Sequence, residues 1–252
     1  MNAAETKVGH QCGVFNFVTL PYDDAQVMMR ALVDLKRRSA DLPEFLILTE
    51  HEPVFTLGRR GTLSDVLVPV EEIERRGACI KQVERGGLIT YHGPGQLVVY
   101  PVFSLRALGL GIRDLVQKLE ASILATLAEF GIEANRKESY PGVWLGQDVK
   151  IASLGLAVRG GITFHGAALN YGSTLTWFDL IRPCGLSGVR MTSMCQILGE
   201  SVDPLLLRRR LLTHLSAHFR LNLVDWASSL PAGSLPGQWP ESVLSAQTLS
   251  LP

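Results

Sequence analysis

The stretch VKIASLGLAVRGGITFHGAALN, residues 149–170, predicts a β-hairpin. Two runs rich in apolar and small residues, 149–158 and 162–170, are separated by Arg159-Gly160-Gly161. A glycine pair between strand-like runs is typical of a tight turn, and strands joined in this way pair antiparallel. We therefore expect a sheet that contains antiparallel neighbours.

Other strands and helices are expected on both sides of this hairpin. Apolar runs predict strands at residues 45–48 and 142–145, and the region 78–102 is rich in strand-forming residues punctuated by glycine turns. Apolar residues at helical spacing predict helices over residues 23–38 and 112–130.

A third helix is predicted to begin at Asp203-Pro204, an N-cap residue followed by proline, and to run through about Phe219. Strands come in clusters, with helices between and after the clusters and no strict alternation. This order favours an α+β fold with a mixed or antiparallel sheet flanked by helices.

Length and charge exclude several classes of protein. The chain has 252 residues, with 24 basic and 24 acidic side chains, so its overall charge gives no argument for a nucleic-acid or anionic-membrane partner. No run is apolar enough to span a membrane, and the first residues lack the apolar segment of a secretory signal. We therefore expect a cytoplasmic protein whose four cysteines are free thiols.

The last part of the sequence differs in composition from the rest. Residues 226–252 alternate Ser, Leu, Pro and Gly without a period. Such a segment is expected to be loosely packed or disordered. The expected organisation is one domain over residues 1–225 and a tail over 226–252.

The segment RGGLITYHGPGQ, residues 85–96, is the densest in chemistry. Four glycines and a proline surround Arg85 and His92, so the backbone can approach a ligand closely while polar side chains converge on it. The alternative is a hairpin with two glycine turns and no ligand. The segment matches neither a phosphate-binding loop nor a dinucleotide-binding fingerprint.

Two further residues stand in settings that suit a site. Lys150 is the one charged residue in the apolar run 149–155, so it is either a surface charge or a lysine that faces a site. His165 is followed by Gly166, Ala167 and Ala168, which leave room beside the strand. The alternative for His165 is a purely structural histidine.

Cys184 is the cysteine in the setting most typical of a reactive thiol. It lies between Pro183 and Gly185, which predicts a loop, whereas Cys79 and Cys195 lack that setting. A thiol, a lysine and two histidines form a workable set of nucleophile and base. No CxxC pair is present, and we expect no metal site.

Together these segments resemble the lipoyl(octanoyl) transferase family. The resemblance runs in order from His51 to Met194, and combined motifs are far more specific than any one of them. The matching stretches are HEPVFTLGR (51–59), RGGLITYHGPGQLVVYP (85–101), GVWLGQDVKIASLG (142–155), FHGAALN (164–170) and IRPCGLSGVRMTSM (181–194).

The resemblance implies an activity, a fold and roles for named residues. Cys184 would be the nucleophile that carries the acyl thioester, and Lys150 the residue that activates its thiol. The fold would be the catalytic domain that biotin and lipoate protein ligases share. The acyl-substrate pocket would be formed by Arg85, Gly86, Gly87, Leu88, Ile89, Thr90, Tyr91, His92, Ser153, Leu154, Gly155, His165, Gly166, Ala167 and Ala168.

The resemblance also implies partners. An octanoyl or lipoyl group would pass from acyl carrier protein to a lysine of lipoyl domains, the first step of endogenous protein lipoylation. The acceptors would be 2-oxoacid dehydrogenase E2 subunits and the glycine cleavage H protein. No cofactor, nucleic acid or membrane would take part, and the chain would act as a monomer.

Two alternatives stay open from the sequence. An ATP-dependent lipoate or biotin ligase of the same fold would need no cysteine, and both the loop cysteine Cys184 and the TYHGPGQ segment argue against it. A non-catalytic acyl-binding protein would have kept the pocket and lost the chemistry. Retention of both Lys150 and Cys184 argues against that second alternative.

Overall fold

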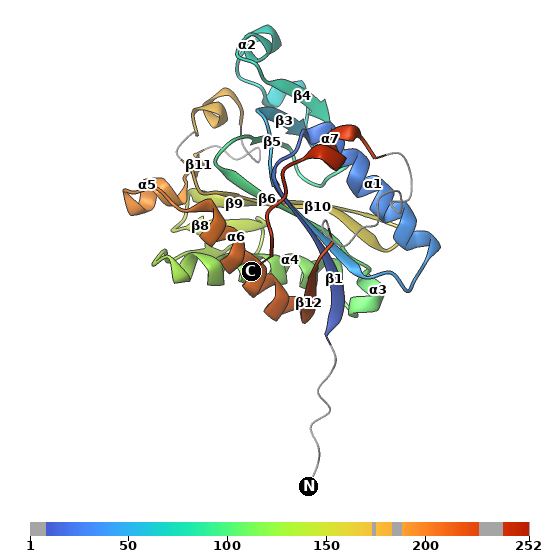
Figure 1. Cartoon of the computed structure of the whole chain (residues 1–252). Coiled ribbons are helices and arrows are strands. Elements are labelled where there is room, and N and C mark those ends of the chain that lie inside the picture. The colour runs from blue at the N-terminus through green and yellow to red at the C-terminus, as the bar shows by residue number, and fades with distance from the viewer. Residues whose placement is uncertain (1–8, 173–174, 183–187, 227–238, 252) are drawn as a thin grey trace.

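The computed structural model describes residues 9–172, 175–182, 188–226 and 239–251. Within this part of the chain, a central sheet of nine strands carries helices on both faces (Figure 1). The order of the main path is β12-β1-β2-β6-β10-β9-β8-β7, and β11 pairs with β9. The strands are β1 His10–Thr19, β2 Glu44–Glu50, β6 Gln96–Val102, β7 Asn135–Arg136, β8 Gly142–Leu145, β9 Val149–Arg159, β10 Ile162–Asn170, β11 Arg190–Met191 and β12 Leu221–Asp225.

The central sheet is mixed. β1 pairs parallel with both β2 and β12, and β11 pairs parallel with β9. The remaining pairs are antiparallel, including the predicted hairpin, in which Ile162 pairs with Arg159 and Leu169 with Ala152. The expectation of an α+β fold with a mixed sheet flanked by helices is therefore confirmed.

A small second sheet stands at one end of the molecule, in the upper part of Figure 1. Its order is β4-β3-β5, and its strands are β3 Val54–Leu57, β4 Cys79–Gln82 and β5 Ile89–His92. The short helix α2, Val70–Arg75, follows β3 and precedes β4. The glycine-rich segment 85–96 includes β5 of this sheet, and its Gly86 N–H donates to Leu156 O of the central sheet.

Helices cover the two faces of the central sheet. The core on one face contains Met28, Met29 and Leu32 of α1, Tyr22–Arg38, and the core on the other contains residues of α4, Ile112–Glu129, and α6, Pro204–Phe219. All three long helices were predicted from the sequence. Short helices complete the described part of the chain: α3 Leu105–Leu108, α5 Met194–Leu198, α7 Glu241–Ser245 and the 3₁₀ turns Leu63–Asp65 and Thr176–Leu180.

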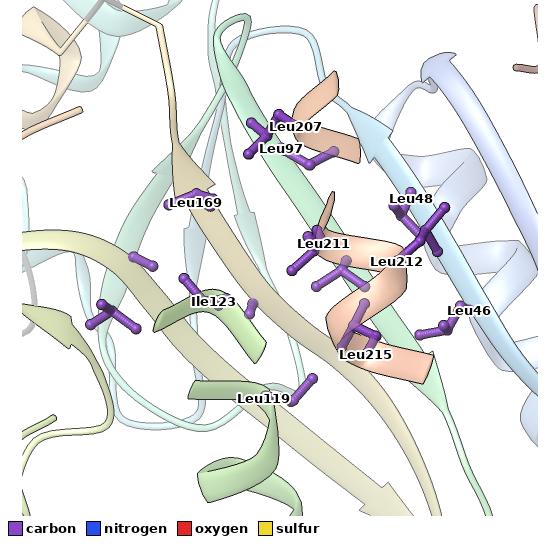
Figure 2. Packing of buried hydrophobic residues seen from close by; sticks show 14 of the residues in the cluster. Leu46, Leu48, Leu97, Leu119, Ile123, Leu169, Leu207, Leu211, Leu212 and Leu215 are labelled. Atoms are coloured by element: carbon purple, nitrogen blue, oxygen red, sulfur yellow. The ribbon is translucent and has the colours of Figure 1, made fainter. Parts of the chain in front are cut away.

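The core beneath α4 and α6 is formed almost entirely by branched aliphatic side chains. Figure 2 shows Leu97 of β6 beside Leu207 of α6, and Leu169 of the sheet, Leu211 of α6 and Ile123 of α4 belong to the same cluster. The α6 helix begins as predicted, because the Asp203 carboxylate accepts a hydrogen bond from Leu205 N at 2.9 Å and Pro204 takes the first turn.

The described end of the chain is packed onto the sheet. Trp239 is buried with its ring 5.5 Å from that of Phe15, and Leu249 N donates to Asn16 O at 2.7 Å. Residues 239–251 therefore differ from the loose tail expected for 226–252, because the Trp239 ring and the Leu249 backbone have long-range partners on β1. Residues 227–238 lie outside the described part, and the boundary at residue 225 stays a prediction.

Among the described residues, no helix combines the length and the apolar character needed to cross a bilayer.

We predict that Leu211→Ala lowers the free energy of unfolding by about 2–5 kcal/mol, since it leaves a cavity in a close-packed core. Leu205→Ala on the same helix is the control and should change it by less than about 0.5 kcal/mol. The Leu211 side chain is 1% exposed and Leu205 is 44% exposed. Urea unfolding measures both, and equal losses would contradict the described packing of α6.

Candidate active site

A cavity of about 450 Å³ lies between the small sheet, the central sheet and the N-terminal end of α4. Its walls come from the segment 85–92, from β9 and β10, from β6, and from the turn that precedes β8. Small residues such as Gly155, Gly166 and Ala168 form much of the sheet side. The cavity therefore has the depth that a flexible chain requires.

The structure brings nearly all predicted site residues to this cavity. Lys150 lines it, and so do all predicted pocket residues except Tyr91. Segments that are far apart in sequence, 85–92, 150–156 and 165–168, thus share one cavity.

Tyr91 does not line the cavity, because its ring packs into the core of the small sheet. Its neighbours Thr90 and His92 line the cavity, while the Tyr91 ring packs 5.3 Å from Phe55 and 5.5 Å from Trp177. The assignment of Tyr91 to the pocket followed from its place in the motif and is corrected here: Tyr91 belongs to the core of the small sheet.

The predicted nucleophile Cys184 lies outside the described residues. Before it, Arg182 N donates to Asp65 O at 2.8 Å. After it, β11 pairs with β9 so that Met191 is opposite Lys150, and Thr192 N donates to Lys150 O at 2.9 Å. The chain that follows Cys184 therefore runs beside Lys150.

Lys150 is buried on an interior strand, with 2% of its surface exposed. Its Nζ donates to Pro141 O at 3.0 Å and lies 4.7 Å from the centre of the Trp144 ring. A carbonyl oxygen and an aromatic face both stabilise an ammonium group. The alternative of a surface charge is therefore wrong, and Lys150 faces the cavity.

His92 is held by a chain of buried amides. Its Nδ1 lies 2.7 Å from Gln96 Oε1, Gln96 Nε2 donates to Asn170 Oδ1 at 2.8 Å, and Asn170 Nδ2 donates to Thr192 O at 3.0 Å. Because an amide oxygen only accepts, the proton is on Nδ1 and Nε2 is the accepting nitrogen. Burial lowers the pKa of His92 well below its ordinary value, so the ring is neutral at pH 7.

His51, which opens the motif HEPVFTLGR, supports the cavity from behind. Its Nδ1 lies 2.7 Å from Leu20 O, so Nδ1 donates, and its Nε2 accepts from the Tyr100 hydroxyl at 2.7 Å. Burial lowers the pKa of His51 to about 4. A neutral imidazole thus orients Tyr100, which lines the cavity.

His165 occupies a strained position in β10, with φ of 55°. Burial and the nearby Arg85 guanidinium lower its pKa to about 4. Gly166 follows, and a Cβ there would lie 2.0 Å from Val99 O, so only glycine allows β6 and β10 to pair at this point. The cavity wall here depends on this backbone geometry.

The Arg85 guanidinium points back into the small sheet. Its Nη2 donates to Thr56 Oγ1 at 2.8 Å and Nη1 donates to Gly86 O at 3.0 Å. Gly86 N in turn donates to Leu156 O of β9 at 2.9 Å. Arg85 therefore holds the glycine-rich segment in place against β9.

Several lining residues were not predicted from the sequence. Val98 and Tyr100 alternate along β6, and this alternation can be read from the sequence. Which face of the sheet they occupy follows only from the pairing of β6 with β10. Ile112 and Tyr140 are exposed at the cavity. The full set is Tyr22, Arg60, Val98, Tyr100, Ile112, Val116, Ser139, Tyr140, Pro141 and Leu156.

The prediction that the sequence contains no HxxxH pair is wrong, because His214 and His218 on α6 form one. His214 Nε2 is 2.6 Å from Glu129 Oε1, and His218 Nδ1 is 2.8 Å from His214 O. In the part of the chain that the structure describes, no three His, Cys, Asp or Glu residues are grouped to hold a metal ion.

The cavity combines apolar walls, neutral histidines and tyrosines, and a buried lysine. Such a setting suits the transfer of an uncharged acyl group with proton exchange at one cationic site.

Solved structures with this fold define its class. The chain matches a putative lipoate protein ligase from T. acidophilum with bound lipoic acid at a TM-score of 0.66 and 16% identity, over 86% of this chain and 88% of that one. Lipoate-protein ligase A bound with ATP matches with the same TM-score and identity, over 85% and 88%. The fold is that of the lipoate ligase catalytic domain.

Sequence relatives place the chain more narrowly. Residues 21–216 match the family model of the lipoyl protein ligase A/B catalytic domain. An octanoyltransferase of Syntrophobacter fumaroxidans is 42% identical over 84% of this chain and 91% of its own length, and one of Cellvibrio japonicus is 45% identical over 75% and 83%. The chain belongs to the lipoyl(octanoyl) transferase family and is an acyltransferase that acts in protein lipoylation.

We predict that acid destabilises the fold through its buried histidines. The unfolded chain protonates His51 near pH 6.5, whereas the folded chain keeps it neutral down to about 4, so stability falls as the pH falls through this window. From pH 7 to 5 the loss is about 2 kcal/mol for this histidine.

Urea unfolding of His51→Gln at both pH values should show a loss smaller by that amount. His10→Gln, at an exposed position on β1, should lose as much as the parent. An equal pH dependence in His51→Gln and the parent would contradict the assignment.

Proposed function

We propose that the chain moves an octanoyl group from acyl carrier protein to a specific lysine of lipoyl domains, through a thioester on Cys184. The observation that carries the proposal is the buried Lys150 at a deep cavity, next to the strand that follows Cys184. Family membership supports the acyl group and the reaction class. The acceptors would be 2-oxoacid dehydrogenase E2 subunits and the glycine cleavage H protein.

The first half of the reaction exchanges one thioester for another. The Cys184 thiolate attacks the donor carbonyl, the bond to the carrier sulfur breaks, and the carrier thiolate leaves and takes up a proton from the Lys150 ammonium, which becomes neutral. The ammonium of Lys150 would stabilise the Cys184 thiolate before attack. Because the two bonds are chemically alike, no ATP is needed.

The second half forms an amide. The acceptor amine attacks the Cys184 thioester, the carbon–sulfur bond breaks, and the thiolate leaves. The amine enters as an ammonium and must lose a proton first, which Lys150 would accept in its neutral form. The nitrogen loses a second proton to solvent as the amide forms. An amide is more stable than a thioester, so the donor supplies the driving force.

The cavity would hold the acyl chain. Its small residues Gly155, Gly166, Ala167 and Ala168 leave space along the sheet, and each methylene buried contributes about 0.8 kcal/mol. A lipoyl group, an eight-carbon chain with two sulfurs, would use the same space. A thiol nucleophile requires a reducing compartment, so we place the enzyme, acting as a monomer, in the cytoplasm.

We predict that octanoyl-acyl carrier protein adds one octanoyl mass to the protein in the absence of ATP, and that Cys184→Ala abolishes the adduct. Cys79→Ala and Cys195→Ala, which replace the other cysteines outside the core, are the controls and should keep it. Intact-mass spectrometry makes the measurement. An adduct that disappears with Cys79 or Cys195 would refute the assignment, and a requirement for ATP would favour a ligase.

We predict that Lys150→Arg keeps part of the thiolate stabilisation, because arginine is cationic, yet loses most transfer to the acceptor, because guanidinium stays protonated. Lys150→Ala should lose both. The pH dependence of Cys184 alkylation and the rate of lipoyl-domain octanoylation report the two effects separately.

Lys137→Arg is the matched control for the size of guanidinium. Lys137 Nζ also lies over the Trp144 ring, at 4.3 Å, but does not line the cavity. Thermal melting checks that each variant is folded. Transfer by Lys150→Arg at the parental rate would exclude Lys150 as a proton acceptor.

A further inference from the structure

A single peptide unit lies between Lys150 and a buried carboxylate. The carbonyl of Pro141 accepts from Lys150 Nζ at 3.0 Å, and the N–H of Gly142, in the same peptide unit, donates to Glu120 Oε1 at 2.8 Å. Hydrogen bonds in series polarise one another, most strongly where water is excluded. An ammonium and a carboxylate are thus joined through one polarised peptide.

Glu120 is placed where a carboxylate would otherwise be unfavourable. It is 4% exposed, on the face of α4 whose neighbours Leu119 and Ile123 belong to the core. The pKa of Glu120 is raised, because the effect of burial exceeds that of the Gly142 N–H hydrogen bond and of the Arg136 and Lys150 charges, which lower it. The apolar neighbours of Glu120 make no polar contact with its carboxylate, whereas the Gly142 N–H, in the peptide that contacts Lys150, donates to it.

Gly142 permits the close approach. Its φ is 142°, and a Cβ at this position would lie 2.3 Å from Lys150 Cε and 2.7 Å from Ala152 O. Any side chain would therefore displace the lysine or the strand. The geometry that joins Glu120 to Lys150 explains why Gly142, the first residue of the stretch GVWLGQDVKIASLG, is a glycine.

Lys137 is another charged group near Lys150, and both lie over the same aromatic ring. Lys137 Nζ and Lys150 Nζ both lie over Trp144, at 4.3 and 4.7 Å from its centre. Arg136 completes the positive groups that act on Glu120. Glu120 is an anion that the Gly142 N–H links to this group of positive charges.

We infer that Glu120 is a positioning residue for the transfer reaction. It holds the Pro141 carbonyl against Lys150 Nζ and, as an anion, favours the ammonium form that the first half of the reaction needs. The inference rests on the proposed roles of Cys184 and Lys150. Removing the charge should therefore have opposite effects on the two halves of the reaction.

The test uses Glu120→Gln, which removes the charge and keeps an amide oxygen that can accept from Gly142 N–H. Octanoylation of Cys184 at pH 7 should slow at least about threefold, since the Pro141 carbonyl is held less firmly against Lys150 Nζ and the local anion is lost. The pH of half-maximal transfer from isolated acyl-enzyme to the lipoyl domain should fall by about one unit. A general loss of structure would slow both halves and leave the midpoint in place.

Two further variants complete the design. Glu120→Asp keeps the charge on a shorter side chain, so it should slow transfer without moving the midpoint, and it serves if Glu120→Gln does not fold. Glu44→Gln is the matched control, because Glu44 is also buried and accepts from a backbone N–H, that of Ser104 at 2.7 Å, yet pairs with Lys36 at 3.1 Å and not with the peptide that contacts Lys150.

The inference is overturned if Glu120→Gln matches Glu44→Gln in both half-reactions and in the pH midpoint, or if Glu120→Asp shifts the midpoint as Glu120→Gln does. Failure of the underlying proposal looks different. In that case Cys184→Ala or Lys150→Ala would retain transfer, whatever the Glu120 variants do.

Discussion

Burial of the Lys150 ammonium within the central sheet is the constraint on which the site depends. An unpaired buried charge costs several kcal/mol, so the surrounding elements must offset it. The Pro141 carbonyl, the Trp144 ring and, through one peptide, the Glu120 carboxylate do so. These groups come from β8, from the turn before it and from α4, which explains why α4 and β8 meet at this end of the sheet.

The same constraint shapes the rest of the cavity. Apart from Lys150 and Arg85, the deep polar residues are neutral histidines and tyrosines, because burial lowers the pKa of His51, His92 and His165. Hydrogen bonds set the tautomers of His51 and His92, and both rings are neutral near pH 7. In such surroundings the charge of Lys150 acts with little screening, which favours thiolate formation and proton transfer at one place.

Much of this arrangement follows from local sequence patterns. The hairpin of β9 and β10, the helices α4 and α6 and most of the cavity lining were predicted, since periodicity, caps and glycine turns act over a few residues. Strand β1 was missed because its buried run does not alternate and its partner β12 lies some two hundred residues away. Tyr91 was misplaced, and Glu120 went unnoticed, because strand facing and a contact from α4 to β8 depend on tertiary pairing.

The central claim is that an acyl-enzyme on the route to amide formation is made in this cavity. The most direct measurement is a single-turnover chase, in which isolated octanoyl-enzyme is mixed with an apo lipoyl domain and both species are followed by mass spectrometry. The account predicts that the thioester decays as the octanoyl domain appears, with one rate constant that is at least as large as kcat. A decay slower than kcat, or octanoyl domain that forms while the thioester persists, would contradict it.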